Sequence, residues 1–296
     1  MTSARLKQLR RSRKSQNALR IANSNSHRSK RDQTFCPGCP HRASYWGIRE
    51  ALQRDQRGGF VCGDIGCYAM AVLFQAAGFH TAKTLHAMGS GAGIASGFGK
   101  LGPFGMTQPV LAVCGDSTFY HAAIPALINA VHQRADMTFI VLDNSGTAMT
   151  GFQSHPGLDV NAMGEAAPMV DIAALCGAMG VPVTIGDPFD LIETRETLNR
   201  LLEEPGVKVL ILKQSCALSP EKKGKKRFLV RVDDTLCRGE ACGCNRLCTR
   251  IFRCPGLLWN RERKRAEIDE VICAGCGFCA GICPAGAIRS EEAAKP

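Results

Sequence analysis

The sequence predicts an α/β protein with a mostly parallel sheet, followed by a small cysteine-dense α+β domain. Three observations lead to this fold class: apolar runs alternate with amphipathic segments over residues 35–216, cysteines gather in C-x-x-C groups, and few aliphatic residues follow residue 228. The longer segments Phe119–Gln133 and Leu191–Leu202 are expected as helices that cover the sheet. The apolar segments expected as strands are Phe60–Cys62, Pro109–Cys114, Met137–Leu142, Val181–Ile185 and Val207–Leu212.

Composition divides the chain into four parts. Residues 1–34 hold ten Lys or Arg and one acid, a net +9 of the total +11, so we expect a basic disordered head. A solvated tail or an upstream start site explains such a head, and an organellar transit peptide is the alternative. Residues 35–218 form the predicted α/β domain, 219–227 a charged linker, and 228–296 a domain organised by metal rather than by an aliphatic core.

Charge and hydropathy narrow the classes of protein. Outside the head the net charge is only +2, which argues against a nucleic-acid partner. No apolar run approaches the roughly 20 residues needed to cross a bilayer, and no signal peptide is visible. We therefore expect a cytoplasmic protein without membrane contact. Sixteen cysteines grouped as C-x-x-C, with no secretion signal, favour metal binding over disulfides.

The last cysteines form an iron–sulfur motif. It is C-x-x-C-x-x-C-x-x-x-C-P, made by Cys273, Cys276, Cys279 and Cys283–Pro284. This is the run of bacterial [4Fe–4S] ferredoxins, whose fourth cysteine ligates the other cluster. Zinc is the alternative, but its two C-x-x-C pairs usually lie farther apart. The motif predicts a ferredoxin-like domain in which Cys254 completes the cluster of Cys273, Cys276 and Cys279.

A second cluster needs ligands upstream of this run. By the crossed ligation of such ferredoxins, Cys283 is expected to be one of them, so three more are required. Four cysteines compete for these places. We expect Cys237 as the first ligand and Cys248 as the third. The sequence leaves the choice between Cys242 and Cys244 open.

Two polar motifs follow neighbouring predicted strands. Gly115–Asp116–Ser117 comes directly after Cys114, and Asp143–Asn144 comes directly after Leu142. Both then lie at the carboxyl ends of parallel strands, where open sheets bind ligands. Carboxylate and amide oxygens suit Mg²⁺, and a glycine lets the backbone approach a diphosphate closely. A plain turn is the alternative, because Asp and Asn are common there.

Longer strings around these motifs carry a family resemblance. GDSTFYHAAIPALINAV (115–131), DNSGTAMTGFQSHPG (143–157), CPGCPHR (36–42) and GDIGCY (63–68) resemble the large subunit of indolepyruvate ferredoxin oxidoreductases, within the 2-oxoacid:ferredoxin oxidoreductases. The resemblance covers residues 35–289. It implies a thiamine-diphosphate-binding fold, the C-terminal part of that subunit, and two to three [4Fe–4S] clusters.

The resemblance also implies roles at the strand ends. It makes Asp116, Asn144 and the Gly146 carbonyl ligands of Mg²⁺. Thr150–Gly151–Phe152–Gln153 matches a TGxQ loop beside the diphosphate, although relatives often carry His where Phe152 stands. Met88–Gly89 resembles the segment that lines the thiazolium ring. The full set of expected cofactor-binding residues is Gly115, Asp116, Ser117, Asn144, Gly146, Thr150, Gly151, Gln153, Met88 and Gly89.

Histidines and the remaining cysteines complete the candidate site. Possible acid–base groups are His41, His121 and His155, with a structural role as the alternative. The pair Cys36 and Cys39 is either a redox dithiol or, as the resemblance implies, part of a proximal [4Fe–4S] cluster. The further ligands of that cluster would be Cys67 and Cys216. Three cysteines lie in apolar runs and are expected as buried thiols: Cys62, Cys114 and Cys176.

The activity that this resemblance implies is oxidative decarboxylation of an arylpyruvate, such as indolepyruvate, to acyl-CoA and CO₂, with electrons passed to ferredoxin. It also implies an oligomer with partner subunits, which carry a pyrimidine-binding domain and a domain of the small-subunit type. One alternative is an electron-transfer protein whose thiamine site is vestigial. Another is a zinc-dependent nucleic-acid binder, based on charge and cysteines alone.

Overall fold

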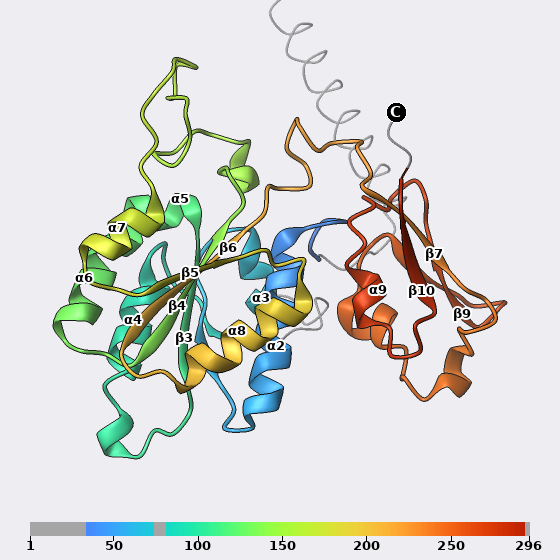
Figure 1. Cartoon of the computed structure of the whole chain (residues 1–296), viewed down its shortest axis with the longest axis horizontal. Coiled ribbons are helices and arrows are strands. Elements are labelled where there is room, and N and C mark those ends of the chain that lie inside the picture. Colours follow the sequence, from blue (N-terminus) through green and yellow to red (C-terminus); the bar gives the residue numbers. More distant parts are fainter. Residues whose placement is uncertain (1–33, 74–80, 294–296) are drawn as a thin grey trace, which may run out of the picture. The chain divides into compact units, whose positions relative to one another are not determined.

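The parallel sheet at the centre of the fold has six strands in the order β2-β1-β3-β4-β6-β5 (Figure 1). The computed structural model describes residues 34–73 and 81–293. The predicted head, apart from Thr34, lies outside the described residues. From Thr34 onward the chain clusters as one compact unit. The strands are β1 (Phe60–Cys62), β2 (Ala82–Thr84), β3 (Val110–Gly115), β4 (Met137–Asp143), β5 (Val183–Gly186) and β6 (Val207–Lys213).

All five predicted strands are present, within two residues at either end. β2 was not predicted, because it has only three residues and one of them, Lys83, is exposed. The centre of the sheet is apolar on both faces, as in other parallel sheets: every residue of β3 is buried. This pattern explains why β3 and β4 could be recognised as strands from the sequence.

Helices cover both faces of the sheet (Figure 1). Alternate side chains of β4 point to opposite faces: Ile140 and Leu142 join one buried cluster, while Phe139 and Val141 join the other. The first cluster packs against α2 (Pro40–Asp55) and α8 (Leu191–Glu203). The second packs against α4 (Ser90–Phe98), α6 (Ile124–His132) and α7 (Ile172–Ala178).

The predicted helix Phe119–Gln133 is interrupted. It begins as α5 (Asp116–Thr118), passes through a π turn, η4 (Phe119–Ala123), and continues as α6. Pro125 stands in the first turn of α6 and has no backbone N–H. The helical bond that this residue would donate is therefore missing, which accounts for the irregular turn before it.

The cysteine-dense part of the chain is built from short antiparallel pairs. β7 (Phe228–Val232) pairs with β10 (Ile288–Glu292), and β8 (Leu257–Asn260) pairs with β9 (Arg265–Ile268). Its helical turns are η6 (Gly239–Cys242), η7 (Cys248–Phe252) and α9 (Cys279–Ile282). The remaining short elements of the chain are η1 (Cys67–Ala69), α3 (Met70–Leu73), η3 (Gly102–Phe104) and η5 (Ala148–Thr150).

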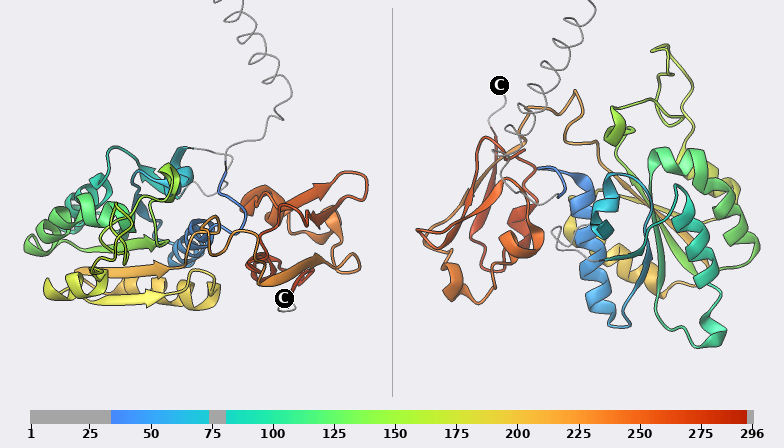
Figure 2. Two further views of the ribbon diagram at one scale, coloured as in Figure 1. Left: turned by 90° about the horizontal axis from the view of Figure 1, so that it is seen from above. Right: turned by 180° about the vertical axis from the view of Figure 1, so that it is seen from behind.

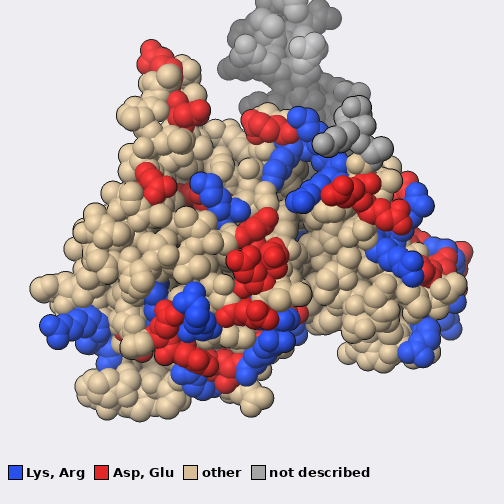
Figure 3. Space-filling model, in the orientation of Figure 1, with Lys and Arg blue, Asp and Glu red and all other residues tan. Residues whose placement is uncertain are grey.

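A long loop lies beyond the carboxyl ends of the strands. Residues 144–171 connect β4 to α7 and rise above the sheet both in Figure 1 and in the rear view of Figure 2. Lys and Arg lie interspersed with Asp and Glu over the face shown in Figure 3. Among the helices in the described ranges, none combines the length and the apolar composition of a membrane span.

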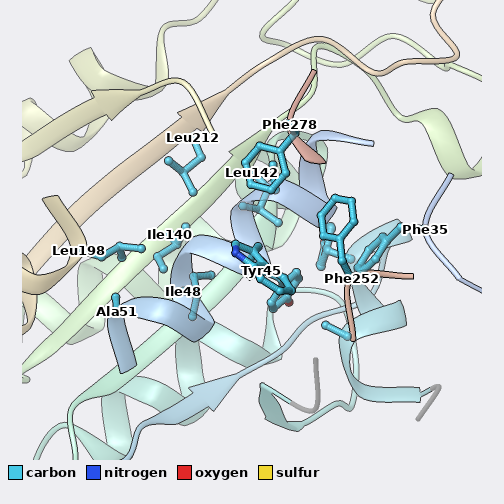
Figure 4. Close-up of a cluster of buried hydrophobic side chains, with 14 of the residues drawn as sticks. Phe35, Tyr45, Ile48, Ala51, Ile140, Leu142, Leu198, Leu212, Phe252 and Phe278 are labelled. Atoms are coloured by element: carbon cyan, nitrogen blue, oxygen red, sulfur yellow. The ribbon is translucent and has the colours of Figure 1, made fainter. Parts of the chain in front are cut away.

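The cysteine-dense part contributes aromatic residues to the cluster around α2. Phe252 and Phe278 stack with their ring centroids 5.6 Å apart, and Phe252 meets Trp46 of α2 edge-on at 5.5 Å. Figure 4 shows Phe252 and Phe278 beside Tyr45 and Phe35. Burial of apolar surface thus helps to hold this part of the chain, in addition to any metal that it binds.

Candidate functional site

The carboxyl ends of β3 and β4 bring two polar side chains together. The strands are neighbours, and Gly115 at the end of β3 pairs with Leu142 of β4. Asp116 follows β3 and Asn144 follows β4, and these residues are only 2% and 6% exposed. Two polar groups are therefore buried side by side, at the edge where parallel sheets bind ligands.

Oxygen atoms converge at this point. The Asn144 amide atom that faces the site lies 3.1 Å from the Gly146 carbonyl oxygen and 3.2 Å from Asp116 Oδ1. With its nitrogen inward, the amide donates hydrogen bonds to both oxygens. With its oxygen inward, three oxygens from three residues meet and require a cation between them. This donor set, a carboxylate, an amide and a carbonyl, fits Mg²⁺.

The Asp116 carboxylate is held in its charged form. Burial raises its pKa, but hydrogen bonding and charge from His155 and the backbone N–H groups of Ser117 and Gly146 together lower the pKa below the usual value. Ser117 N donates to Asp116 Oδ1 at 2.8 Å and Gly146 N to Oδ2 at 3.1 Å. Asp116 is therefore available as an anionic ligand at neutral pH.

The predicted TGxQ segment forms a closed loop next to these residues. Gln153 Nε2 donates to the Thr150 carbonyl at 2.9 Å, and Phe152 N donates to the Thr147 carbonyl at 3.0 Å. Phe152 has a φ of 62°, which is unusual for a residue other than glycine. Thr150, Gly151 and Gln153 are exposed, so their polar groups are accessible to a ligand.

Gly115 also has a structural reason within the fold. A Cβ at this position would lie 2.8 Å from the Tyr68 ring. The Tyr68 hydroxyl donates to the Ile65 carbonyl at 2.7 Å and shares a hydrogen bond with Thr118 Oγ1 at 3.1 Å. The glycine is thus required by the close packing of Tyr68, which links the segment before α3 to α5.

Asp64 positions the segment Met88–Gly89. This residue is fully buried, and its Oδ1 accepts from Gly89 N at 3.0 Å while its Oδ2 accepts from Gly91 N at 3.1 Å. Gly89 has a φ of +83°, and a Cβ there would lie 2.7 Å from the Ala122 carbonyl oxygen. Met88 is half exposed, so the fixed backbone presents its side chain to solvent.

The three candidate histidines lie in different environments. His155 is buried, and its Nε2 lies 3.3 Å from Asp116 Oδ2, while its Nδ1 accepts from Gly157 N at 3.1 Å. His41 is buried against Tyr68, and burial lowers its pKa to about 4, opposed by the charge of Asp116. His121 is exposed. The structure thus brings two of the three histidines to the site.

The predicted proximal thiols lie near one another. Burial raises the pKa of the Cys36 thiol, and Cys216 raises it further. Burial raises the pKa of Cys67 to about 11, with added contributions from Cys36 and Cys216. Cys39 N donates to the Cys36 carbonyl, and Cys216 N donates to the Asn144 carbonyl at 3.0 Å. The last bond connects these thiols to the polar strand ends.

A second set of thiols contains Cys254 and the cysteines of the downstream run. Burial raises the pKa of the Cys279 thiol, and Cys276, Cys254 and Cys273 all raise it further. The same neighbours act on Cys276, whose pKa is raised to about 11, mainly by burial. These four cysteines are the ones expected to share one cluster.

A third set surrounds Cys248. Burial raises the pKa of this thiol to about 11, followed by the charges of Cys244, Cys283 and Cys237. Cys242 is not among the main causes, and its own raised pKa results first from a hydrogen bond with Cys244. This neighbourhood favours Cys244 over Cys242 at the place that the sequence left open. In the described part of the chain, no group of three or more His, Cys, Asp or Glu side chains is arranged around a point for a single metal ion.

No role for Asp64 or Tyr68 was predicted from the sequence. The sequence did contain a signal for Asp64. A Gly-Asp pair stands at the end of β1 (Gly63–Asp64), as another stands at the end of β3 (Gly115–Asp116). Nothing in the sequence pointed to Tyr68, since its partners come from a distant segment. The expectation for the leftover cysteines is confirmed: Cys62, Cys114 and Cys176 are fully buried.

Relatives with curated names cover most of this chain. It is 40% identical over 265 residues to indolepyruvate oxidoreductase subunit IorA of Methanothermobacter thermautotrophicus, and 36% identical over 274 residues to the subunit of the same name from Pyrococcus horikoshii. Each match covers 88% of this chain, which spans about 40% of the length of those relatives.

Comparison of folds and families agrees with the geometry. A solved structure of 2-oxoglutarate:ferredoxin oxidoreductase from Magnetococcus marinus is similar, with a TM-score of 0.51 and 18% identity over 65% of this chain and 67% of that one. The family model of the thiamine pyrophosphate enzyme C-terminal TPP binding domain matches residues 64–212, which is half of the chain. This segment contains β2 to β5, all of β6 but its last residue, and both polar strand ends. The chain therefore belongs to the thiamine pyrophosphate enzymes and carries their C-terminal TPP binding domain.

Proposed function

We propose that this chain is the thiamine diphosphate and iron–sulfur subunit of a 2-oxoacid:ferredoxin oxidoreductase. Its reaction is the oxidative decarboxylation of an arylpyruvate such as indolepyruvate to acyl-CoA and CO₂, with electrons passed to ferredoxin. The observation that carries the proposal is that a Mg²⁺-type oxygen set and a group of thiols adjoin in one chain, connected by the bond from Cys216 N to the Asn144 carbonyl.

Asp116, Asn144 and the Gly146 carbonyl would hold Mg²⁺, which would offset the negative charge of a diphosphate. Thiamine diphosphate, when bound, supplies the nucleophilic carbon and the electron sink for loss of CO₂. The chain's part is binding and orientation. Asp64 fixes the backbone of Gly89, and with it the place of Met88, through its two hydrogen bonds. His155, whose Nδ1 accepts a backbone hydrogen bond, keeps its Nε2 toward Asp116.

The three thiol sets would hold up to three [4Fe–4S] clusters, which carry electrons singly. The proximal set is Cys36, Cys39, Cys67 and Cys216. The set around Cys254 adds Cys273, Cys276 and Cys279, and the set around Cys248 adds Cys237, Cys244 and Cys283. The electrostatic interactions between thiols within each set support these assignments.

Partner subunits would complete the enzyme. Thiamine enzymes also need a pyrimidine-binding domain. A subunit with that domain, one of the small-subunit type and a ferredoxin acceptor are part of this proposal. The names of the relatives, which describe an oxidoreductase subunit, support it.

The test is binding of thiamine diphosphate with Mg²⁺ to anaerobically purified chain, together with iron and labile-sulfide analysis. We expect saturable binding that requires Mg²⁺, and loss of at least tenfold in affinity in Asp116→Ala, since the carboxylate is the charged ligand. Asp159 is an exposed aspartate of the long loop, residues 144–171. Asp159→Ala serves as the control and should bind the cofactor normally.

The possible results separate the candidate functions. Iron and sulfide without Mg²⁺-dependent cofactor binding would leave an electron-transfer protein and reject the thiamine site. Cofactor binding without iron would reject the oxidoreductase. Oxidation of 2-oxoacids is then measured after mixing with the partner subunits, using a low-potential dye and a panel of aryl and alkyl 2-oxoacids to identify the substrate.

A further inference from the structure

A buried arginine joins two of the proposed iron–sulfur sites. Arg42 lies in the first turn of α2 and is only 2% exposed. Its Nη1 donates to the Phe252 carbonyl, and its Nη2 donates to the Phe35 carbonyl. Phe35 immediately precedes Cys36, and Phe252 stands two residues before Cys254. One guanidinium thus holds the backbone of two thiol-bearing segments that are far apart in sequence.

The aromatic rings of the same residues enclose the guanidinium. Its central carbon lies 5.5 Å from the Phe35 ring centroid and 5.4 Å from the Phe252 centroid, distances typical of cation–π contacts. Thr34 Oγ1 accepts a further bond from Nη2 at 3.2 Å. The charge is therefore fixed in place and shielded from water.

Thiols are the potential counter-charges of this cation. The groups that act on Arg42 are Cys254, Cys39, Cys36 and Cys276, in decreasing order of strength. Two belong to the proximal set and two to the set around Cys254. A buried charge is costly unless an opposite charge pairs with it. Neutral thiols would leave this arginine uncompensated, whereas thiolates bound to iron would compensate it from both sides.

The loops that carry the two thiol sets pack directly against each other. Gly38 lies between Cys36 and Cys39 and has a φ of +69°. A Cβ at Gly38 would lie 2.7 Å from the Cβ of Ala274 and 3.8 Å from the Cβ of Cys276. Ala274 stands in the loop between Cys273 and Cys276. The two cysteine loops therefore touch without an intervening side chain, and Arg42 flanks the contact.

We propose that Arg42 is a positioning residue whose buried charge is shared by the proximal site and the site of Cys254, and that it raises the reduction potential of the clusters at both. The inference rests on the proposed function, since it requires iron at both sites. An added electron makes a cluster more negative, so a fixed cation nearby favours the reduced form.

The experiment is an EPR-monitored redox titration of the full chain, prepared anaerobically, with iron and sulfide measured on each sample. The neutral variants are Arg42→Gln and Arg42→Met, and Arg42→Lys keeps the charge. Arg49→Gln is the matched control, because Arg49 lies on the same helix and stacks on Trp46 at 5.2 Å. In the neutral variants we expect the reduced-to-oxidised ratio at fixed potential to fall at least tenfold, about 59 mV for a one-electron couple.

The outcomes decide between a shared charge and a structural clamp. Arg42→Lys and Arg49→Gln should stay near the wild-type potentials. Unchanged potentials in an iron-loaded neutral variant, or equal shifts in Arg42→Lys and Arg42→Gln, overturn the inference. Where neutral variants fail to hold iron, full loading of Arg42→Lys supports the charge, and its equal failure indicates a clamp and refutes it. Wild-type chain without iron would instead reject the proposed function itself.

Discussion

Neighbouring thiols favour one of two nearby cysteines as a ligand. Among the thiols that act on Cys248, Cys244 acts most strongly, followed by Cys283 and Cys237. Thiolates that share a cluster bind one metal centre, so Cys244 is the better candidate. Cys242 interacts first with Cys244.

We predict that Cys244→Ser removes one cluster, about four iron atoms per chain, whereas Cys242→Ser retains all of them. Iron analysis and EPR of the two variants, purified side by side, provide the measurement. The pair is its own control, because each variant replaces one thiol two positions from the other. Iron loss in Cys242→Ser alone, or equal loss in both, would contradict the assignment.

At the scale of residues, the sequence indicated which polar side chains meet at the strand ends, but not which distant residues pack around them. The motifs that contain Asp116 and Asn144 indicated oxygen ligands at strand ends, and the structure brings these side chains within 3.2 Å. The partner of Gly115 could not be predicted, since Tyr68 reaches it only through the tertiary fold. The same holds for Arg42, because its contacts with Phe252 span 210 positions.

The first turn of α4 is constrained by the residues that follow β1. Gly91 N donates to Asp64, and a Cβ on Gly91 would lie 2.8 Å from the Gly63 carbonyl oxygen. Gly93, two residues later in the same helix, has no atom within 4 Å of such a Cβ. The two glycines therefore differ in their reason for being glycine.

We predict opposite effects of alanine at these positions. Gly91→Ala should reduce the free energy of unfolding by about 1–3 kcal/mol, since backbone atoms must shift to admit the methyl group. Gly93→Ala should increase it by about 0.5–1 kcal/mol, because alanine restricts the unfolded chain and favours the helix. Chemical denaturation of both variants checks this. A stable Gly91→Ala protein would show that Asp64 does not hold α4 tightly.

At the scale of elements, length and burial determined what the sequence could predict. β3 and β4 are buried runs of six and seven residues, and both were expected. β2 has three residues of mixed burial and gave no pattern. The interruption at η4 was also missed, although Pro125, in the interior of the predicted helix Phe119–Gln133, was a signal for it.

Over the whole chain, two kinds of core hold the structure. The sheet part has buried clusters on both faces made of aliphatic side chains from β1, β3, β4 and β6. In the cysteine-dense part, the thiols of Cys237, Cys248, Cys254, Cys273, Cys276 and Cys283 themselves pack against the first cluster. Potential metal ligands therefore occupy core positions in the cysteine-dense part.

This difference predicts a local response to loss of iron. Because metal binding contributes free energy of folding where a core is small, removing iron with a chelator under reducing conditions should expose β7 to β10 to hydrogen exchange. Strands β3, β4 and β6 should keep their protection, since the second cluster, which also buries side chains of these strands, contains no proposed ligand. Exchange measured by mass spectrometry on loaded and stripped chain, with Cys176→Ser as a variant whose lost thiol lies outside the proposed sites, tests both halves. Equal protection of β7 to β10 in the two samples would mean that the aromatic contacts of Phe252 and Phe278 suffice to hold this part without metal.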